Sequence, residues 1–184
     1  MEASREQTHF VLVHGICHGA WCWHKLKPRL KSAGHRVTAL DLAASGINMK
    51  AIQDVHTFHD YSEPLLDLFA SLPPNQKVIL VGHSLGGLNL AIAMEKYPEK
   101  VAVGVFVTAL MPDTTHKPSY VLDQDLELAK TLVRPTSWFH EDLSKVKNFS
   151  NEGYGSVPQV YVVCDEHLAL DLCHCLLEIA RKYA

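Results

Sequence analysis

Apolar residues follow two alternating patterns along this chain. Short continuous apolar runs are typical of strands buried on both faces, whereas apolar residues at helical spacing are typical of helices that cover a sheet. The predicted strands are His9–His14, Arg36–Leu40, Lys77–Gly82, Val101–Thr108 and Gln159–Cys164. The predicted helices are Trp23–Ala33, Tyr61–Ser71, Gly86–Tyr97 and Leu168–Tyr183. This alternation predicts an α/β protein with a mostly parallel central sheet and helices on both faces.

The motif Gly82-His83-Ser84-Leu85-Gly86 lies between a predicted strand and a predicted helix. In that setting G-x-S-x-G is typical of the nucleophile elbow of α/β-hydrolases. The turn is strained, and glycines two residues to either side of Ser84 let neighbouring backbone pass close to it. The helix that follows directs N–H groups and its positive dipole end at an oxyanion forming there. The motif therefore predicts a serine nucleophile in acyl transfer.

A serine nucleophile needs a pair of hydrogen-bond donors for the oxyanion. One donor is expected in the turn that follows the first strand, His14-Gly15-Ile16, because this fold places its second oxyanion donor at such a turn. The predicted oxyanion hole consists of the backbone N–H groups of Ile16 and Leu85. An ordinary strand-to-helix turn is the alternative interpretation of the first segment.

The general base is expected late in the chain, since the fold orders its triad as serine, acid, histidine. His167 follows the last predicted strand at the carboxyl edge of the sheet, whereas His174 falls within a helical pattern. Asp165 ends the same strand and is the predicted acid, although a carboxylate that merely ends a strand fits that position equally well. Asp171, on the final helix, is the weaker candidate.

Composition and charge exclude several function classes. The net charge of −3 at pH 7 gives no basic field for nucleic acid, and no apolar run is long enough to cross a membrane. The opening residues are too polar for a signal peptide, so a cytosolic location is expected. The five cysteines form an odd set without metal-ligand spacing and are expected to be reduced thiols. The sequence predicts no metal and no organic cofactor.

Long segments of the chain resemble the plant methylesterase and hydroxynitrile lyase family of α/β-hydrolases. They include HFVLVHGICHGAWCWHKLKP, GHRVTALDLAASGIN, KVILVGHSLGGLNLAIAMEKYPEKV and MPDTTHKPSYVLDQ. The resemblance implies an α/β-hydrolase fold with Ser84 as nucleophile, Ile16 and Leu85 as the oxyanion hole, and a homodimer. It implies a serine carboxylesterase that hydrolyses methyl esters of small plant acids, such as methyl salicylate, methyl jasmonate or methyl indole-acetate, through an acyl-enzyme.

Several residues at the predicted site match the esterases of this family and differ from its lyases. The lyases carry threonine where Gly15 stands and Glu-Ser-Cys where this chain has His83-Ser84-Leu85. They also carry a lysine after the catalytic histidine, where this chain has Leu168. Two alternatives stay open: a lyase that cleaves cyanohydrins, and a non-catalytic protein that binds a small acid.

The chain is shorter than members of that family at two internal junctions, Gln124–Asp125 and Glu166–His167. We expect a single domain over residues 1–184 with a shortened lid or cap at about 111–157. In the family the catalytic aspartate falls where His167 now stands. Either the printed sequence omits residues that the protein contains, in which case Asp165 is a stand-in for an acid outside this numbering, or the chain has lost them and is an inactive relative.

Overall fold

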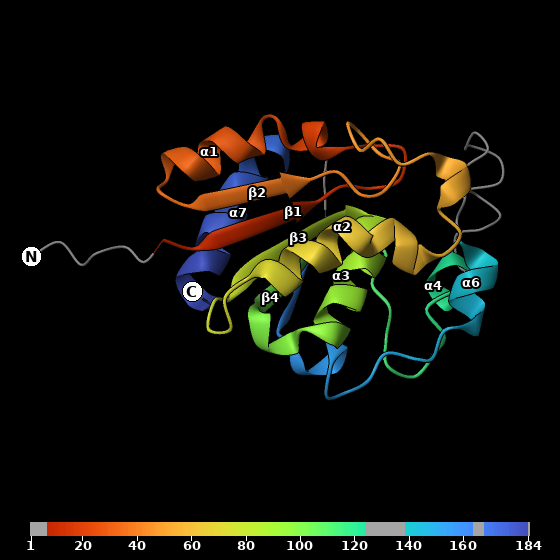
Figure 1. Cartoon of the computed structure of the whole chain (residues 1–184). Coiled ribbons are helices and arrows are strands. Elements are labelled where there is room, and N and C mark those ends of the chain that lie inside the picture. The colour runs from red at the N-terminus through yellow and green to blue at the C-terminus, as the bar shows by residue number, and fades with distance from the viewer. Residues whose placement is uncertain (1–6, 124–138, 164–167, 184) are drawn as a thin grey trace, which may run out of the picture.

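A five-stranded parallel sheet forms the centre of the protein (Figure 1). The computed structural model describes residues 7–123, 139–163 and 168–183. The strands, in the spatial order β2-β1-β3-β4-β5, are β1 (His9–Val13), β2 (Arg36–Leu40), β3 (Val78–Ser84), β4 (Val101–Ala109) and β5 (Gln159–Val162). Every neighbouring pair is parallel. The predicted fold class is confirmed.

Helices cover both faces of the sheet. Helices α1 (Leu26–Ser32) and α7 (Leu168–Tyr183) lie on one face, and α2 (Phe58–Ser71) and α3 (Gly86–Lys96) lie on the other (Figure 1). In the described part of the chain no helix is long and apolar enough to cross a membrane.

Side chains of β1 alternate between two buried clusters. In β1, Phe10 and Leu12 pack against the α1 and α7 side, while Val11 and Val13 pack against the α2 and α3 side. All four are fully buried. A strand whose two faces are both covered needs a continuous apolar run, which is the pattern that the sequence shows.

Helix α2 begins at Phe58, three residues before the predicted Tyr61. A capping box explains the difference: the Asp60 N–H donates to Thr57 Oγ1 (3.0 Å), and the Thr57 N–H donates to Asp60 Oδ2 (3.0 Å). These two bonds satisfy backbone donors that the first helical turn leaves unpaired. Before Tyr61 the first turn offers only one apolar residue, Phe58, followed by two polar ones, so the hydrophobic pattern alone places the start too late.

The described part of residues 111–157 packs against α2 and α3. It contains the short helices α4 (Tyr120–Asp123) and α6 (His140–Lys145). Asp142 Oδ2 accepts the N–H of Phe58 (2.8 Å), and Glu95 Oε2 accepts the N–H groups of Ser150 (2.9 Å) and Tyr154 (3.0 Å). The single-domain boundary and the lid at about 111–157 stay predictions. Both chain junctions, 124/125 and 166/167, involve residues outside the described ranges.

Candidate active site

Ser84 is the last residue of β3, at the carboxyl edge of the sheet. Its backbone has φ +54°, a left-handed conformation that L-residues rarely adopt. The pairing with β4 shifts register between His83 and Ser84, and Ser84 O accepts the N–H of Leu110 (2.9 Å). Such strain persists only where the surrounding structure holds it, and it is concentrated at functional sites. The chain thus makes a sharp, fixed turn at the half-buried Ser84.

The glycines on either side of Ser84 allow close backbone approach. A Cβ atom at Gly82 would lie 2.5 Å from Leu90 Cδ1, on the helix that follows the turn. A Cβ atom at Gly86 would lie 2.8 Å from the carbonyl oxygen of His14. Both separations are too short for a side chain. The two glycines of the G-x-S-x-G motif therefore allow two close approaches of α3, to β3 at Gly82 and to the end of β1 at Gly86.

The turn after β1 lies directly against the serine. A Cβ atom at Gly15 would be 2.9 Å from Ser84 Cβ and 3.2 Å from His83 Nδ1. The peptide that follows Gly15 carries the N–H of Ile16, and the peptide that follows Ser84 carries the N–H of Leu85. Within the residues that the structure describes, neither N–H group has a hydrogen-bond acceptor. Two unpaired donors therefore flank Ser84, one on each side.

Two histidines close to the serine have lowered pKa values. Burial lowers the pKa of His83, and the nearby His18 lowers it further. The two rings meet edge to face with centroids 6.3 Å apart. His18 is itself held by the carbonyl oxygen of Ile16 (2.8 Å to Nδ1) and by stacking on Trp21. Burial also lowers the pKa of His14, which precedes the glycine turn.

A cavity of 260 Å³ opens beside this turn. It is lined by residues from five separate stretches of the chain: Ile16, Cys17, His18, Ala44, Ser45, Gly46, Ile52, Tyr61 and Phe139. The Ser45 and Tyr61 hydroxyl groups lie 3.5 Å apart, and burial raises the pKa of Tyr61. The cavity thus combines apolar walls with hydroxyl groups. No local motif predicts it, because its walls come together only in the folded chain.

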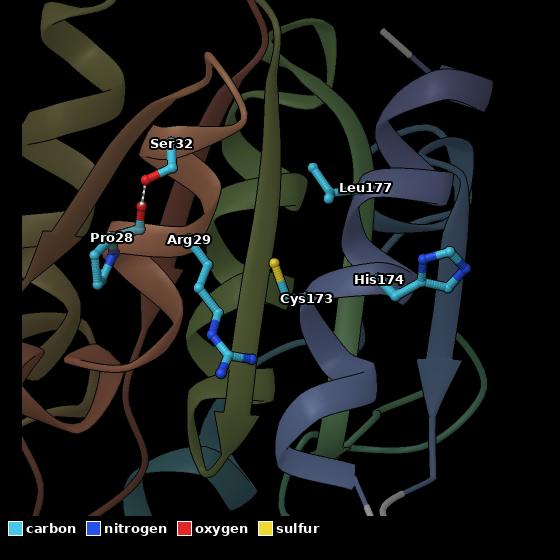
Figure 2. Close-up of a pocket in the computed structure, with 6 residues that line it drawn as sticks. All are labelled: Pro28, Arg29, Ser32, Cys173, His174 and Leu177. Atoms are coloured by element: carbon cyan, nitrogen blue, oxygen red, sulfur yellow. Dashed lines mark hydrogen bonds between the residues drawn. The ribbon is translucent and has the colours of Figure 1, made fainter.

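The predicted base and acid, His167 and Asp165, lie outside the described residues. His174 is exposed on α7, as its helical pattern predicts. It is one of the residues that line a hollow of 580 Å³ between α1 and α7. Its ring lies on the side of α7 away from α1 (Figure 2). His116 forms an exposed pair with Asp113 (Nδ1 to Oδ2, 2.7 Å).

Among the described residues, no group of three or more His, Cys, Asp or Glu side chains could hold a metal ion.

Comparison with known proteins identifies the family. A family model described as alpha/beta hydrolase fold matches residues 8–141. The chain belongs to the alpha/beta hydrolase family. This hydrolase is 50% identical to methylesterase 1 of Arabidopsis thaliana, over 92% of this chain and 82% of that protein. The crystal structure of polyneuridine aldehyde esterase superimposes with a TM-score of 0.87 at 39% identity, covering 95% of this chain and 100% of that one. The predicted resemblance to plant methylesterases is confirmed.

Internal segments of these relatives are missing from this hydrolase. Salicylic acid-binding protein 2 of Nicotiana tabacum is 42% identical over 97% of this chain and 99% of its own length. That alignment is 258 residues long, whereas this chain has 184 residues. The difference therefore comes from gaps within the aligned region. Their location at 124/125 and 166/167 stays a prediction.

Proposed function

We propose that this hydrolase is a serine carboxylesterase that cleaves methyl esters of small carboxylic acids. The observation that carries the proposal is the left-handed Ser84 at the end of β3, flanked by the unpaired N–H groups of Ile16 and Leu85. Ester hydrolysis needs a nucleophile with donors aimed at the developing oxyanion. Relatives of 42 to 50% identity named methylesterase or salicylic acid-binding protein support the same reaction class and a small ester substrate.

The proposed mechanism is acyl transfer in two steps. Ser84 Oγ attacks the ester carbonyl carbon while His167 takes its proton, and Asp165 orients the histidine. The N–H groups of Ile16 and Leu85 stabilise the oxyanion. The histidine then gives its proton to the departing methoxy group, which leaves as methanol. A water molecule activated by the same histidine cleaves the acyl-enzyme and releases the acid.

The cavity beside the turn supports a small acid as the acyl portion of the substrate. Its volume of 260 Å³ is just below the usual range for ligand pockets, roughly 300–1,000 Å³. The hydroxyl groups of Ser45 and Tyr61 offer hydrogen bonds to a polar substituent, and Ile16 and Phe139 offer apolar contact. Methyl salicylate, a compact ring with one hydroxyl group, matches this combination of size and chemistry.

Gly15 favours the esterase over the lyase alternative. A threonine in its place would bring a Cβ atom within 2.9 Å of Ser84 Cβ, so this turn is shaped for a residue without a side chain. A departing cyanide also needs a nearby cation to avoid an uncompensated charge in a low-dielectric site. The position after His167 is Leu168, which cannot supply one. Homodimer formation and a cytosolic location stay predictions.

Methanol release from methyl salicylate by the purified chain tests the proposal. We expect turnover in the wild-type protein and none above background in Ser84→Ala. Ser32→Ala, on the exposed face of α1, is the control and keeps wild-type turnover. No turnover of methyl esters by a folded wild-type protein would favour the non-catalytic binder, and turnover by Ser84→Ala would remove the proposed nucleophile.

A further inference from the structure

His14 is fully buried, and both of its ring nitrogens are hydrogen-bonded. Nδ1 lies 2.7 Å from the carbonyl oxygen of Gly15, and Nε2 lies 3.1 Å from the backbone nitrogen of Leu42. A carbonyl oxygen only accepts, so Nδ1 carries the hydrogen and donates it to Gly15. A backbone N–H only donates, so Nε2 presents its lone pair to Leu42. The partners therefore select one neutral tautomer, in agreement with the lowering of the His14 pKa by burial.

The bond from His14 fixes the orientation of a peptide beside the serine. The carbonyl group of Gly15 and the N–H group of Ile16 belong to the same peptide unit. That unit is planar and trans, so the two groups point in opposite directions. The Gly15 oxygen also accepts the backbone N–H of His18 (3.3 Å). With its oxygen held by these two donors, the peptide cannot rotate, and the direction of the Ile16 N–H is set.

We propose that His14 is a positioning residue that aims the N–H of Ile16 at the oxyanion through its Nδ1–H bond to Gly15. The inference rests on the proposed function, in which that N–H stabilises the tetrahedral intermediate. A donor held in place before reaction needs no reorganisation when charge develops, which is the source of oxyanion-hole catalysis. His14 makes no contact with substrate in this account and acts only through the Gly15–Ile16 peptide.

His9 provides a matched control at the other end of the same strand. It too is buried, its Nε2 lies 2.9 Å from Thr38 Oγ1, and its Nδ1 lies 3.0 Å from Gln76 Nε2. Each histidine thus makes two ring bonds, one of which reaches β2 or the residues just after it. Only His14 precedes the turn that contacts Ser84. A purely structural role predicts the same behaviour for the two residues.

Asparagine and glutamine at position 14 separate the two ring bonds. The amide nitrogen of Asn is as many bonds from Cα as Nδ1, and the amide oxygen of Gln is as many bonds from Cα as Nε2. His14→Asn therefore keeps a donor for Gly15 and loses the acceptor for Leu42, whereas His14→Gln does the reverse. Each variant loses one buried hydrogen bond, so both should lower the unfolding temperature by similar amounts.

Steady-state hydrolysis of a methyl ester by the four variants is the experiment. We expect His14→Gln to lower kcat by roughly 10- to 100-fold at nearly constant KM, because the lost interaction acts in the transition state. His14→Asn should keep kcat within about threefold of wild type. His9→Asn and His9→Gln should lower the unfolding temperature alone. Equal kcat for the two His14 variants, or an equal loss in the His9 pair, would overturn the proposal.

Imidazole ¹⁵N NMR of the wild-type protein tests the same inference without turnover or a variant. We expect His14 to be neutral with its hydrogen on Nδ1, and a hydrogen on Nε2 at neutral pH would overturn the proposal. The kinetic and NMR experiments also distinguish a failure of the proposed esterase function from a failure of the proposed role of His14. A wild-type protein without esterase activity but with this tautomer would refute the proposed function and leave the positioning of the Ile16 peptide standing.

Discussion

Gly15 and Ser84 approach each other so closely that a Cβ atom on the glycine would lie 2.9 Å from the Cβ of the serine. Real Cβ atoms do not come this near to one another, so any side chain at position 15 must displace either the turn or Ser84. The residue that faces the serine is thus limited by the space between the two backbones. This contact connects the end of β1 with the end of β3 at the carboxyl edge of the sheet.

Gly15→Ala is therefore expected to lower kcat/KM for methyl esters by about tenfold or more, since a displacement of about 1 Å at a reacting group is costly. Gly34→Ala is the control. Gly34 has φ +93° and open space around it, so alanine there costs about 1–2 kcal/mol of stability through backbone strain and leaves activity unchanged. Steady-state kinetics and urea unfolding of both variants check the prediction. Full activity in Gly15→Ala would show that a side chain at position 15 does not displace Ser84.

Stability is expected to fall as the pH drops from 6.5 to 4, in part because of His9. Burial, with a smaller effect from Arg36, lowers its pKa from 6.5 to about 4. Between these values the unfolded chain binds more protons than the folded chain, so acidification favours unfolding. The His9 contribution is at most about 3 kcal/mol, from 1.36 kcal/mol per pKa unit. Below pH 4 both states are protonated at His9 and its contribution stays lost.

Urea unfolding at several pH values, with His9→Asn beside the wild type, measures this effect. The variant should be less stable at pH 7 and should show a smaller loss of stability between pH 6.5 and 4. His24→Asn, at an exposed position, should keep the wild-type slope. Identical slopes for His9→Asn and the wild type would show that His9 does not carry the effect.

Glu95 holds the segment that precedes β5. Its Oε2 atom accepts the N–H groups of Ser150 and Tyr154, and these contacts lower the pKa of the carboxyl group although burial opposes them. Glu95→Ala leaves two backbone donors without their partner and should cost about 1–3 kcal/mol. Hydrogen exchange should quicken at residues 150–154. Glu99→Ala, at an exposed site four residues on, should leave both stability and exchange unchanged.

The sequence predicts the sheet and the sharp turn at Ser84 well, because both depend on local signals. The role of Ser84 as nucleophile stays a prediction. The strand Arg36–Leu40 and the helix Leu168–Tyr183 occupy their predicted residues. Strand β3 runs on to Ser84 rather than ending at Gly82, since its last residues pair with β4 without being apolar. The roles of His167 and Asp165 remain predictions, because both residues fall outside the described ranges.

The cavity and the tautomer of His14 could not be predicted from the sequence. Ser45 and Tyr61 are sixteen residues apart, and only the packing of the loop after β2 against α2 brings their hydroxyl groups together. The sequence predicts His14 as the last residue of an apolar strand, and its hydrogen-bond partner Leu42 is twenty-eight residues away. Features that depend on such distant contacts leave no pattern in the chain.

Filling the cavity should weaken substrate binding. Ser45→Leu places an apolar side chain in a space of 260 Å³ and removes a hydroxyl group, so KM for methyl salicylate should rise by about tenfold or more. Methyl acetate, whose acyl group is much smaller, should be affected less. Equal changes in KM for the two esters would indicate that the acyl group does not occupy this cavity.

The chain is also expected to hydrolyse methyl esters far faster than it cleaves mandelonitrile. Attack on an ester puts charge on the carbonyl oxygen, where the N–H groups of Ile16 and Leu85 are free to donate. Cyanide release requires a cation that the position of Leu168 does not supply. Comparison of kcat/KM for methyl salicylate and mandelonitrile distinguishes the two reactions. Comparable values would favour the lyase.

Mass spectrometry of the protein, acid-quenched during turnover of a p-nitrophenyl ester, shows directly whether Ser84 is the nucleophile. We expect a covalent acyl group to accumulate on the wild-type protein, and peptide mapping to place it on Ser84. Ser84→Ala should carry no such group and release no p-nitrophenol above background. Turnover without a covalent adduct, an adduct on another residue, or undiminished turnover by Ser84→Ala would contradict the assignment of Ser84 as the nucleophile.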